Sequence, residues 1–334
     1  MINHIYYCTA PGCFSLETNT LPDEAPLNYV LIKYLYCGIC GGDYSVYIGR
    51  RQAYPISLGH EFIGTVLSVG PNVINLHPNQ YVISDFNFRC GECEFCKNNH
   101  SHLCHYNNIQ KFSNRAFAEY GLIHKDYLYP VTIKNKIEIA CFIEPLSCIL
   151  HAFDIWKIPY NYPILINGVG SIGTMAVFYL CSVLQCKNVY INDINTLREE
   201  KIMKLFSVKN YKDYPQKFEY IFESTNSIDG IKFSLDTAIP GTYMCIMSHL
   251  YGEDTSFIYE RICQKEIQPV FPLRNGDPQF MFQAINYITK YWENSYNILY
   301  QIDTNLKKLF EEKPQNPFNK QIVDLEHLIW DEAD

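Results

Sequence analysis

The sequence lacks features that would place it in several common classes. Its start, Met1-Ile-Asn-His-Ile-Tyr-Tyr, is too short and too polar to be the apolar core of a secretory signal, and no apolar run reaches the roughly 18 residues that cross a bilayer. Positive charge is scarce, because 27 Lys and Arg stand against 35 Asp and Glu, for a net charge of −8. A nucleic-acid surface needs a basic stripe. We therefore expect a cytoplasmic protein with small-molecule partners, and neither membrane nor nucleic acid.

Cysteine, by contrast, is abundant, with 14 residues. Cys90, Cys93 and Cys96 recur every third residue, and Cys104 follows after seven more residues. This spacing can place four thiolates tetrahedrally around one Zn²⁺, which predicts a structural zinc site in a lobe of about residues 86–110. A disulfide pair and an iron–sulfur cluster are the alternatives. A reducing compartment disfavours the disulfide, and the position of the fourth cysteine disfavours the cluster.

The length and texture of the chain indicate two domains. The 334 residues exceed what a single core usually holds. The first 130 residues alternate short β-rich runs with Gly, Pro and Asn turns, which predicts a small antiparallel barrel or sandwich. The expected strands cover residues 29–36, 62–69, 80–84 and 116–123.

A glycine-rich motif opens the second half. A buried-strand pattern over 162–167 runs into Gly168-Val-Gly170-Ser-Ile172-Gly173, and an apolar helix is expected next. Gly168 would allow a tight turn, Gly170 would let a pyrophosphate approach the backbone, and Gly173 would let the helix pack on the sheet. The phosphates would meet the N-terminus of the helix, where free N–H groups favour anions. The motif, with Ile172 inside it, predicts a dinucleotide-binding site.

The residue after the next expected strand, 188–192, bears on the type of cofactor. Asp193 lies there, and its carboxylate could accept hydrogen bonds from a ribose 2′-OH and would repel a 2′-phosphate, so NAD(H) is favoured over NADP. Arg198 follows five residues later and could offer a cation or stack on the adenine. The alternative is that Asp193 is only a turn residue at the end of a strand.

A second set of metal-binding residue types lies upstream. Cys40, His60 and Glu61 occur within the first part of the chain, and Glu144 precedes the glycine motif. One thiolate, one imidazole and one or two carboxylates with an open position are typical of a catalytic zinc, and Asp43 could orient the histidine. Taken singly these residues have ordinary explanations, since a lone cysteine is usually core and a His-Glu pair is usually surface. Their combination favours the zinc.

Together these motifs resemble those of the zinc-dependent medium-chain dehydrogenases/reductases. The resemblance covers roughly residues 30–275 and is similar to the polyol and sugar-phosphate branch, which includes sorbitol and galactitol-1-phosphate dehydrogenases. The matching segments are residues 38–43, 59–64, 117–120, 144–146 and 151–152, the four-cysteine lobe and the glycine motif.

The resemblance implies an α/β fold with three segments. A GroES-like, β-rich catalytic domain is expected over 1–150, a Rossmann domain with a doubly wound parallel sheet over 151–280, and a return to the catalytic domain over 281–334. It also implies a homodimer or homotetramer.

The same resemblance implies a zinc- and NAD(H)-dependent enzyme with two zinc ions per chain. The catalytic zinc would be held by the positions of Cys40, His60, Glu61 and Glu144. The reaction would interconvert a secondary alcohol (a polyol, a sugar or a polyol phosphate) and its ketone by hydride transfer. A biosynthetic reductase acting on an unusual sugar-derived substrate is an alternative.

One departure concerns the path of the proton. The family usually has a Ser or Thr where this chain has Gly42, and often a His where this chain has Ser45. Glycine cannot relay a proton, so water or a nearby hydroxyl such as Ser45, Tyr44 or Tyr47 would have to replace it. A catalytically retired protein that binds NAD and zinc is therefore a rival hypothesis.

Arginines give the few indications of the substrate. Arg50 and Arg51 precede a proline loop, and Arg115 stands where glycine is common in the family. Arginine suits bidentate recognition of phosphate, so a phosphorylated polyol or sugar is possible, with Arg115 and Tyr47 as candidate substrate contacts. Solvated surface charges are the alternative.

Overall fold

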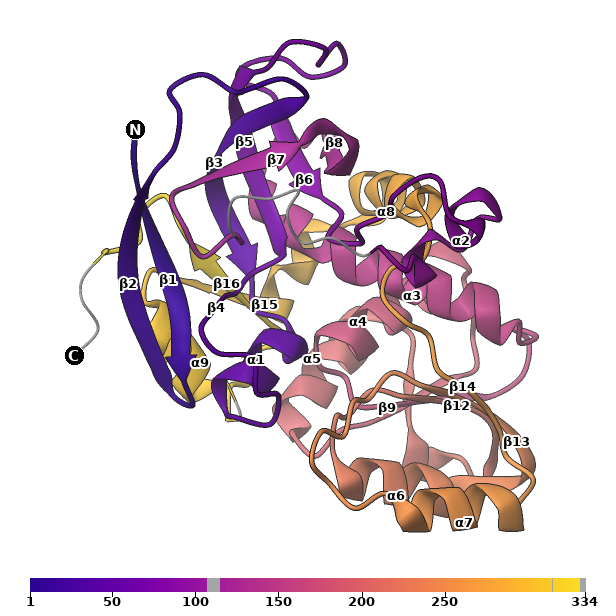
Figure 1. Ribbon diagram of the computed structural model, residues 1–334. Coiled ribbons are helices and arrows are strands. Elements are labelled where there is room, and N and C mark those ends of the chain that lie inside the picture. The colour runs from indigo at the N-terminus through magenta and orange to yellow at the C-terminus, as the bar shows by residue number, and fades with distance from the viewer. Residues whose placement is uncertain (107–114, 314, 331–334) are drawn as a thin grey trace.

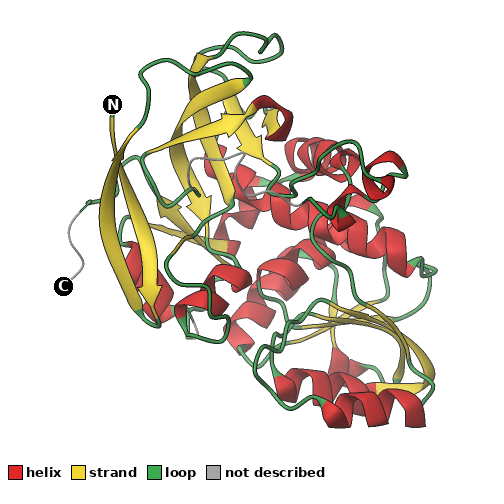
Figure 2. Ribbon diagram, in the orientation of Figure 1, coloured by secondary structure: helices red, strands yellow, loops and turns green. Residues whose placement is uncertain are grey.

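The computed structural model describes residues 1–106, 115–313 and 315–330. Two sheet-centred parts lie side by side: a β-rich part, and a part in which helices cover a sheet (Figures 1 and 2). The predicted α/β fold is confirmed. All fourteen cysteines fall inside the described ranges, and none of them is in a disulfide. Residues 107–110 of the predicted zinc lobe lie outside the described part of the chain.

The β-rich part consists of a seven-stranded and a three-stranded sheet. The larger sheet has the order β15-β16-β3-β5-β6-β8, with β7 paired to β3, and the smaller has the order β2-β1-β4. The strand pairs of both sheets are antiparallel except for β15 with β16, which is parallel. The strands are β1 (Ile2–Ala10), β2 (Cys13–Thr20), β3 (Tyr29–Gly38), β4 (Ile56–Ser57), β5 (Glu61–Val69), β6 (Tyr81–Ser84), β7 (Tyr120–His124), β8 (Leu128–Pro130), β15 (Tyr300–Asp303) and β16 (Lys320–Asp324).

Three of the predicted strands match β3, β5 and β6 to within two residues. The fourth, predicted over 116–123, begins only at Tyr120. The N–H of Phe117 donates instead to the carbonyl of Leu58 at 3.1 Å, so this stretch packs beside the loop that leads into β5. Its apolar residues are fully buried there, which explains why the pattern resembled a strand.

The second sheet is entirely parallel, in the order β11-β10-β9-β12-β13-β14. This is the doubly wound order of dinucleotide-binding folds, in which ligands bind outside the carboxyl ends of the strands where the order reverses. Here that point lies between β9 and β12. The strands are β9 (Ile164–Asn167), β10 (Val189–Asn192), β11 (Lys209–Asn210), β12 (Phe218–Glu223), β13 (Ala238–Ile246) and β14 (Gln268–Val270).

Helices cover both faces of this sheet (Figure 1). One face packs against α3 (Ile143–Trp156), α4 (Ser171–Phe178), α5 (Thr196–Leu205) and α8 (Pro278–Tyr291), and the other against α6 (Ile228–Thr237) and α7 (Ser256–Gln264). Helix α4 continues as a π-helical turn, η5 (Tyr179–Val183). The other helical segments are α1 (Gly41–Tyr47), α2 (Glu94–Lys97), η1 (Ser101–Leu103), η3 (Lys125–Tyr127), η4 (Ile137–Phe142), η6 (Tyr211–Asp213), η7 (Asn294–Leu299) and α9 (Leu306–Glu312).

One described helical stretch, 137–156, is long and apolar enough to cross a membrane by length and composition alone. However, 78 % of its most apolar window is buried inside the protein. Phe153, for example, stacks on Phe222 of β12 with ring centroids 5.6 Å apart. The stretch has the surroundings of a core helix.

The chain returns to the β-rich part near its end. Strand β16 enters the larger sheet between β15 and β3, with Ile322 opposite Gly38. The segment just before β16 contacts both parts of the molecule, since Asn319 donates to the Val169 carbonyl after β9 and Lys313 donates to the Ile39 carbonyl before α1.

Candidate active site and metal centres

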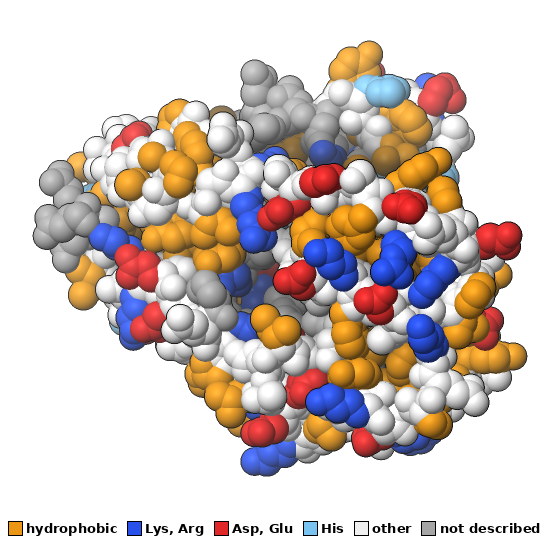
Figure 3. Space-filling model, turned by 90° about the horizontal axis from the view of Figure 1, so that it is seen from below, with side chains coloured by type: hydrophobic (Ala, Val, Ile, Leu, Met, Phe, Trp, Pro, Cys, Tyr) orange, Lys and Arg blue, Asp and Glu red, His pale blue; other side chains and the backbone are white. Residues whose placement is uncertain are grey.

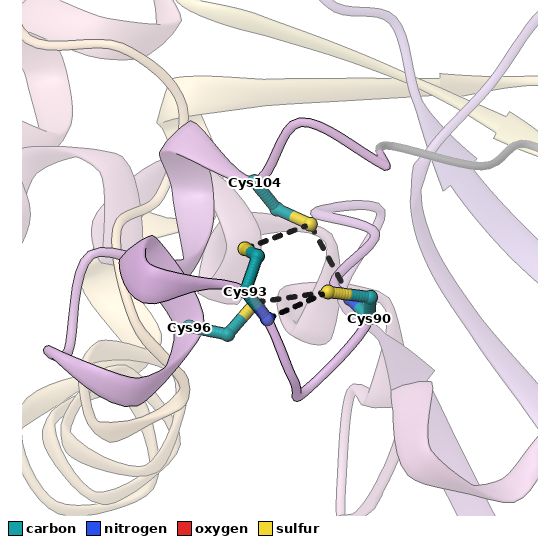
Figure 4. Close-up of side chains that lie close together, drawn as sticks. All are labelled: Cys90, Cys93, Cys96 and Cys104. Carbon is teal, nitrogen blue, oxygen red and sulfur yellow. Dashed lines mark hydrogen bonds between the residues drawn. The ribbon is translucent and has the colours of Figure 1, made fainter.

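The four cysteines of the lobe converge on one point (Figure 4). Their sulfur atoms all lie within 4.8 Å of one another, with Cys90 to Cys96 and Cys93 to Cys104 each at 3.8 Å. Four sulfurs about 2.3 Å from a zinc ion would be about 3.8 Å apart. The N–H groups of Glu92 and Cys93 donate to the Cys90 sulfur and lower the pKa of that thiol to about 6. The residues fit a structural zinc.

A second compact group consists of Cys40, His60 and Glu61, whose ligand atoms also lie within 4.8 Å of one another. Cys40 is the N-cap of α1, directly after β3, and Glu61 begins β5. Because Gly38 of β3 pairs with Glu61 of β5, the antiparallel ladder brings these three residues together. The buried His60 Nδ1 has no hydrogen-bond partner among the described residues. A thiolate, a carboxylate and such an imidazole fit a zinc ion.

Asp43 lies beside the His60 imidazole. Its Oδ1 is 3.5 Å from His60 Nδ1 and accepts a hydrogen bond from the Gly59 N–H at 3.3 Å. Burial opposes the charge of both groups, but their mutual attraction lowers the pKa of the Asp43 carboxyl and raises that of His60. The carboxylate can therefore orient the ring.

Glu61 has a second partner that the sequence analysis missed. Its Oε2 accepts a hydrogen bond from the ammonium group of Lys320, the first residue of β16, and both side chains are almost fully buried. Lys320 also donates to Ser171 Oγ at 3.1 Å, at the start of α4. A Cβ on Gly38 would lie 2.5 Å from Lys320 Cε, so position 38 must be glycine for this pair to form.

Glu144 lies beside the compact group but outside it. It sits in the first turn of α3, where its Oε1 accepts a weak hydrogen bond from the Cys148 thiol at 3.5 Å. Burial and the nearby Glu61 raise the pKa of Glu144 to about 7, although His60 opposes this shift. The described arrangement therefore offers three ligands in contact, with a fourth carboxyl close by.

The glycine motif forms the loop between β9 and α4. Gly168 has φ +89°, and a Cβ there would meet the backbone of Thr225 at 3.0 Å. A Cβ on Gly173 would overlap the carbonyl oxygen of Gly168, so the helix can pack closely only with glycine. Gly170, in contrast, has open space where its Cβ would be. This cradle, with the partly buried Ile172 inside it, fits a dinucleotide.

Asp193 lies next to this loop, at the end of β10. Its Oδ2 accepts a hydrogen bond from the Val169 N–H at 2.7 Å, and its Oδ1 accepts one from the Asn195 N–H at 2.8 Å. Each oxygen keeps a further lone pair. The residue is thus both a turn residue and a carboxylate beside the cradle, so the two interpretations of the sequence are compatible.

Arg198 lies near Asp193, and its side chain reaches a segment close to the end of the chain. Its Nη2 donates to the carbonyl of Asn316 at 2.8 Å, and its Nε donates to the same carbonyl at 3.1 Å. A third, longer bond reaches the carbonyl of Lys313 at 3.4 Å. In this arrangement Arg198 holds a backbone segment that sequence reasoning could not have paired with it.

The predicted proton-relay positions differ in their surroundings. Among the residues that the structure describes, only the Cys40 sulfur lies within 4 Å of a Cβ built on Gly42, at 3.8 Å. The Ser45 hydroxyl donates to the Gly41 carbonyl at 3.0 Å and lies 3.5 Å from Asn226 Nδ2, across the two parts of the molecule. The Tyr47 ring is buried in an aromatic cluster, 5.2 Å from Phe14 and 4.9 Å from Phe310.

Arg115 lies close to the compact group. Its guanidinium is 5.4 Å from the Phe86 ring centroid, and Phe86 packs edge-on against His60 at 6.1 Å. Burial lowers the pKa of Arg115, Asp43 raises it, and Arg51 lowers it again, which places a second arginine nearby. Figure 3 shows basic side chains inside a hollow on the face that it presents.

Comparison with known proteins agrees with this description. Residues 27–133 match the alcohol dehydrogenase GroES-like domain. L-threonine 3-dehydrogenase of Xanthomonas oryzae pv. oryzae is 32 % identical over 192 residues, covering 55 % of each chain, and D-arabitol-phosphate dehydrogenase of Enterococcus avium is 36 % identical over 155 residues, covering 45 % of this chain and 44 % of that one. The chain thus aligns with about half the length of these relatives.

The fold matches over nearly the whole chain. Galactitol-1-phosphate dehydrogenase from Escherichia coli superposes with a TM-score of 0.79 at 20 % identity, covering 96 % of this chain and 99 % of that one. The chain therefore combines a match to the alcohol dehydrogenase GroES-like domain over residues 27–133 with a fold shared with a whole dehydrogenase. Dehydrogenases named for phosphorylated polyols are thus among the proteins that this chain resembles.

Proposed function

We propose that the protein is a zinc- and NAD(H)-dependent oxidoreductase that interconverts a secondary alcohol and its ketone by hydride transfer. One observation supports this most directly. Lys320 contacts both Glu61 of the compact group and Ser171 at the start of α4. The candidate metal ligands and the dinucleotide cradle are therefore one side chain apart, as hydride transfer between a metal-bound substrate and a nicotinamide requires.

Each part of the chain has a role in this proposal. Cys40 and His60 would hold the catalytic zinc with Glu61 or Glu144, and Asp43 would fix the imidazole. The zinc would supply Lewis acidity that lowers the pKa of the substrate alcohol, and the nicotinamide would accept the hydride. The glycine loop and α4 would bind the diphosphate, Asp193 would bind the ribose and favour NAD over NADP, and Arg198 would hold the neighbouring backbone. The four-cysteine lobe would hold a second zinc.

The substrate we favour is a phosphorylated polyol or sugar. Arg115, with Arg51 nearby, brings positive charge close to Cys40 and Asp43, and guanidinium groups suit phosphate oxygens. Two relatives are named for phosphorylated polyols. Arg115→Ala should raise KM for a phosphorylated substrate by about tenfold or more and leave KM for its unphosphorylated parent unchanged. Equal effects on both substrates would argue against a phosphate contact.

A catalytically retired protein is the second candidate, and Gly42 favours it. The described surroundings of Gly42 contain no hydroxyl at the usual relay position, and the Tyr47 ring is packed in the core. This candidate predicts zinc and NAD binding without turnover. The intact set of candidate ligands favours the enzyme.

The decisive experiment measures NADH formation and consumption with polyols, polyol phosphates and secondary alcohols, together with metal analysis of the same sample. Turnover with about two zinc ions per chain would support the enzyme. About two zinc ions per chain without turnover in either direction would support the catalytically retired protein. A protein that binds neither zinc nor the dinucleotide would refute the proposal.

We also propose the domain limits 1–150, 151–280 and 281–334, and a homodimer or homotetramer in the cytoplasm. Strands β15 and β16 join the sheet of the first domain, whereas α8 packs against α3. Gel filtration with light scattering would measure the oligomeric state.

A further inference from the structure

A short segment near the end of the chain lies across the dinucleotide cradle. We call Lys313 together with residues 315–320 the C-terminal strap. Helix α5 holds it from one side, because Arg198 donates to the Asn316 carbonyl and Lys201 Nζ donates to the Pro317 carbonyl at 2.9 Å. At its far end Asn319 Nδ2 donates to the carbonyl of Val169, inside the glycine loop, at 2.5 Å. The strap is therefore fixed to the nucleotide-binding part at two places, helix α5 and the glycine loop.

The strap carries a lysine at each end. Lys320 is 1 % exposed and is satisfied by Glu61 and Ser171. Lys313 is only partly exposed, and its Nζ lies 3.5 Å from the Ile39 carbonyl and 5.9 Å from the Tyr44 ring centroid. Among the described residues no carboxylate lies within ion-pair distance of Lys313. The two lysines thus differ: one has its anion, and the other does not.

An ammonium group in this position is electrostatically unfavourable. Burial disfavours the charge of Lys313, and Lys320 and Arg198 repel it, while Cys40 and Glu61 compensate only in part; together these neighbours lower the pKa of Lys313 to about 8. A zinc ion beside Cys40 would add further repulsion. Uncompensated buried charge is costly, and it is tolerated where a ligand of opposite sign completes the site.

The location of Lys313 indicates which anionic ligand would neutralise its charge. Ile39 is bound through its N–H to the carbonyl of Gln321, the residue after Lys320, at 2.9 Å. The Lys313 ammonium therefore lies near the first residue of β16, whose side chain reaches the N-terminus of α4. That N-terminus, with the open face of Gly170, is where the fold binds phosphate.

We infer that Lys313 binds the diphosphate of the dinucleotide, together with the N–H groups at the start of α4. This inference rests on the proposed function and adds a residue that no sequence motif marks. The diphosphate would supply the anion that Lys313 lacks among the described residues. The C-terminal strap is thus part of the cofactor site, and Arg198 acts as a positioning residue that holds it in place.

The test compares cofactor binding directly. NADH affinity is measured by fluorescence titration for the wild type, Lys313→Gln, Lys313→Arg and the control Lys308→Gln. The control removes an exposed lysine of the neighbouring helix α9, which pairs with Asp303 at 2.7 Å. ADP and adenosine serve as probes with and without the diphosphate. Loss of a charge-assisted hydrogen bond corresponds to an affinity loss of about 10- to 100-fold.

We expect Lys313→Gln to bind NADH and ADP that much more weakly, with adenosine affinity unchanged. Lys313→Arg should stay within about threefold of the wild type, and Lys308→Gln should match it. Unchanged NADH affinity in Lys313→Gln would overturn the inference, and so would an equal loss for adenosine. A raised KM for a phosphorylated substrate with normal NADH affinity would overturn it too, and would reassign Lys313 to the substrate. If the wild type binds neither NADH nor NADPH, the proposed function itself fails.

Discussion

Replacing Lys320 with methionine would test the buried ion pair at the centre of the molecule. Lys320 and Glu61 are 1 % and 2 % exposed. Methionine keeps most of the side-chain volume but leaves Glu61 as a buried carboxylate without its partner. Breaking one side of a buried pair costs about 3–5 kcal/mol. We expect the free energy of unfolding to fall by about that amount, which lowers the urea midpoint by about 1–2 M for a slope of about 2.5 kcal/mol/M.

Urea unfolding followed by tryptophan fluorescence would measure the loss, because Trp156 is buried in α3. Lys308→Met is the matched control: Lys308 is an exposed lysine paired with Asp303, so its urea midpoint should stay close to that of the wild type. Adding Glu61→Gln to Lys320→Met removes both charges and should recover most of the stability. Zinc content is measured on every sample. Equal midpoints for Lys320→Met and Lys308→Met would refute the reasoning.

Three further predictions concern the proposed site. Gly42→Ser adds a hydroxyl where only the Cys40 sulfur would lie near the new Cβ, at 3.8 Å; the pH profile of turnover should change, and an unchanged profile and rate would remove the relay argument. Cys93→Ser should lower bound zinc from about two to about one per chain and reduce the melting temperature; metal analysis that still finds about two would contradict the four-cysteine site. Gly173→Val would place its side chain against the Gly168 carbonyl, so NADH binding should be lost; affinity within about threefold of the wild type would contradict the cradle.

The parts that sequence predicted well depend on short-range patterns. Four cysteines within a span of fifteen residues lie close together once the loop closes, because the chain between them is short. Their sulfurs are 3.8 Å apart in the pairs Cys90–Cys96 and Cys93–Cys104. The glycine motif likewise indicates its own local structure, because the strand, the turn and the helix that it joins are contiguous in the sequence. The family resemblance added the doubly wound order of the parallel sheet, which no local pattern determines.

The parts that sequence did not predict depend on contacts between distant residues. Lys320 is 259 residues from Glu61, and nothing in its neighbourhood marks it as different from a surface lysine at the start of a strand. Arg198 was expected to offer a cation to the cofactor or to stack on the adenine, and no local pattern indicated that its guanidinium contacts a carbonyl 118 residues away. Tyr47 has a hydroxyl and lies near Cys40 in sequence, yet one turn of α1 directs its ring into the core.

The pairing of Lys320 with Glu61 also sets an order of events during synthesis. Cys40, His60 and Glu61 are synthesised early, whereas Lys320 follows 259 residues after Glu61. At about 5–20 residues per second this interval is about 13–52 s. Through that time the first sheet lacks β16, and the Glu61 carboxylate has no ammonium partner from the strap. The β-rich part can therefore be completed only after the entire parallel sheet has been made.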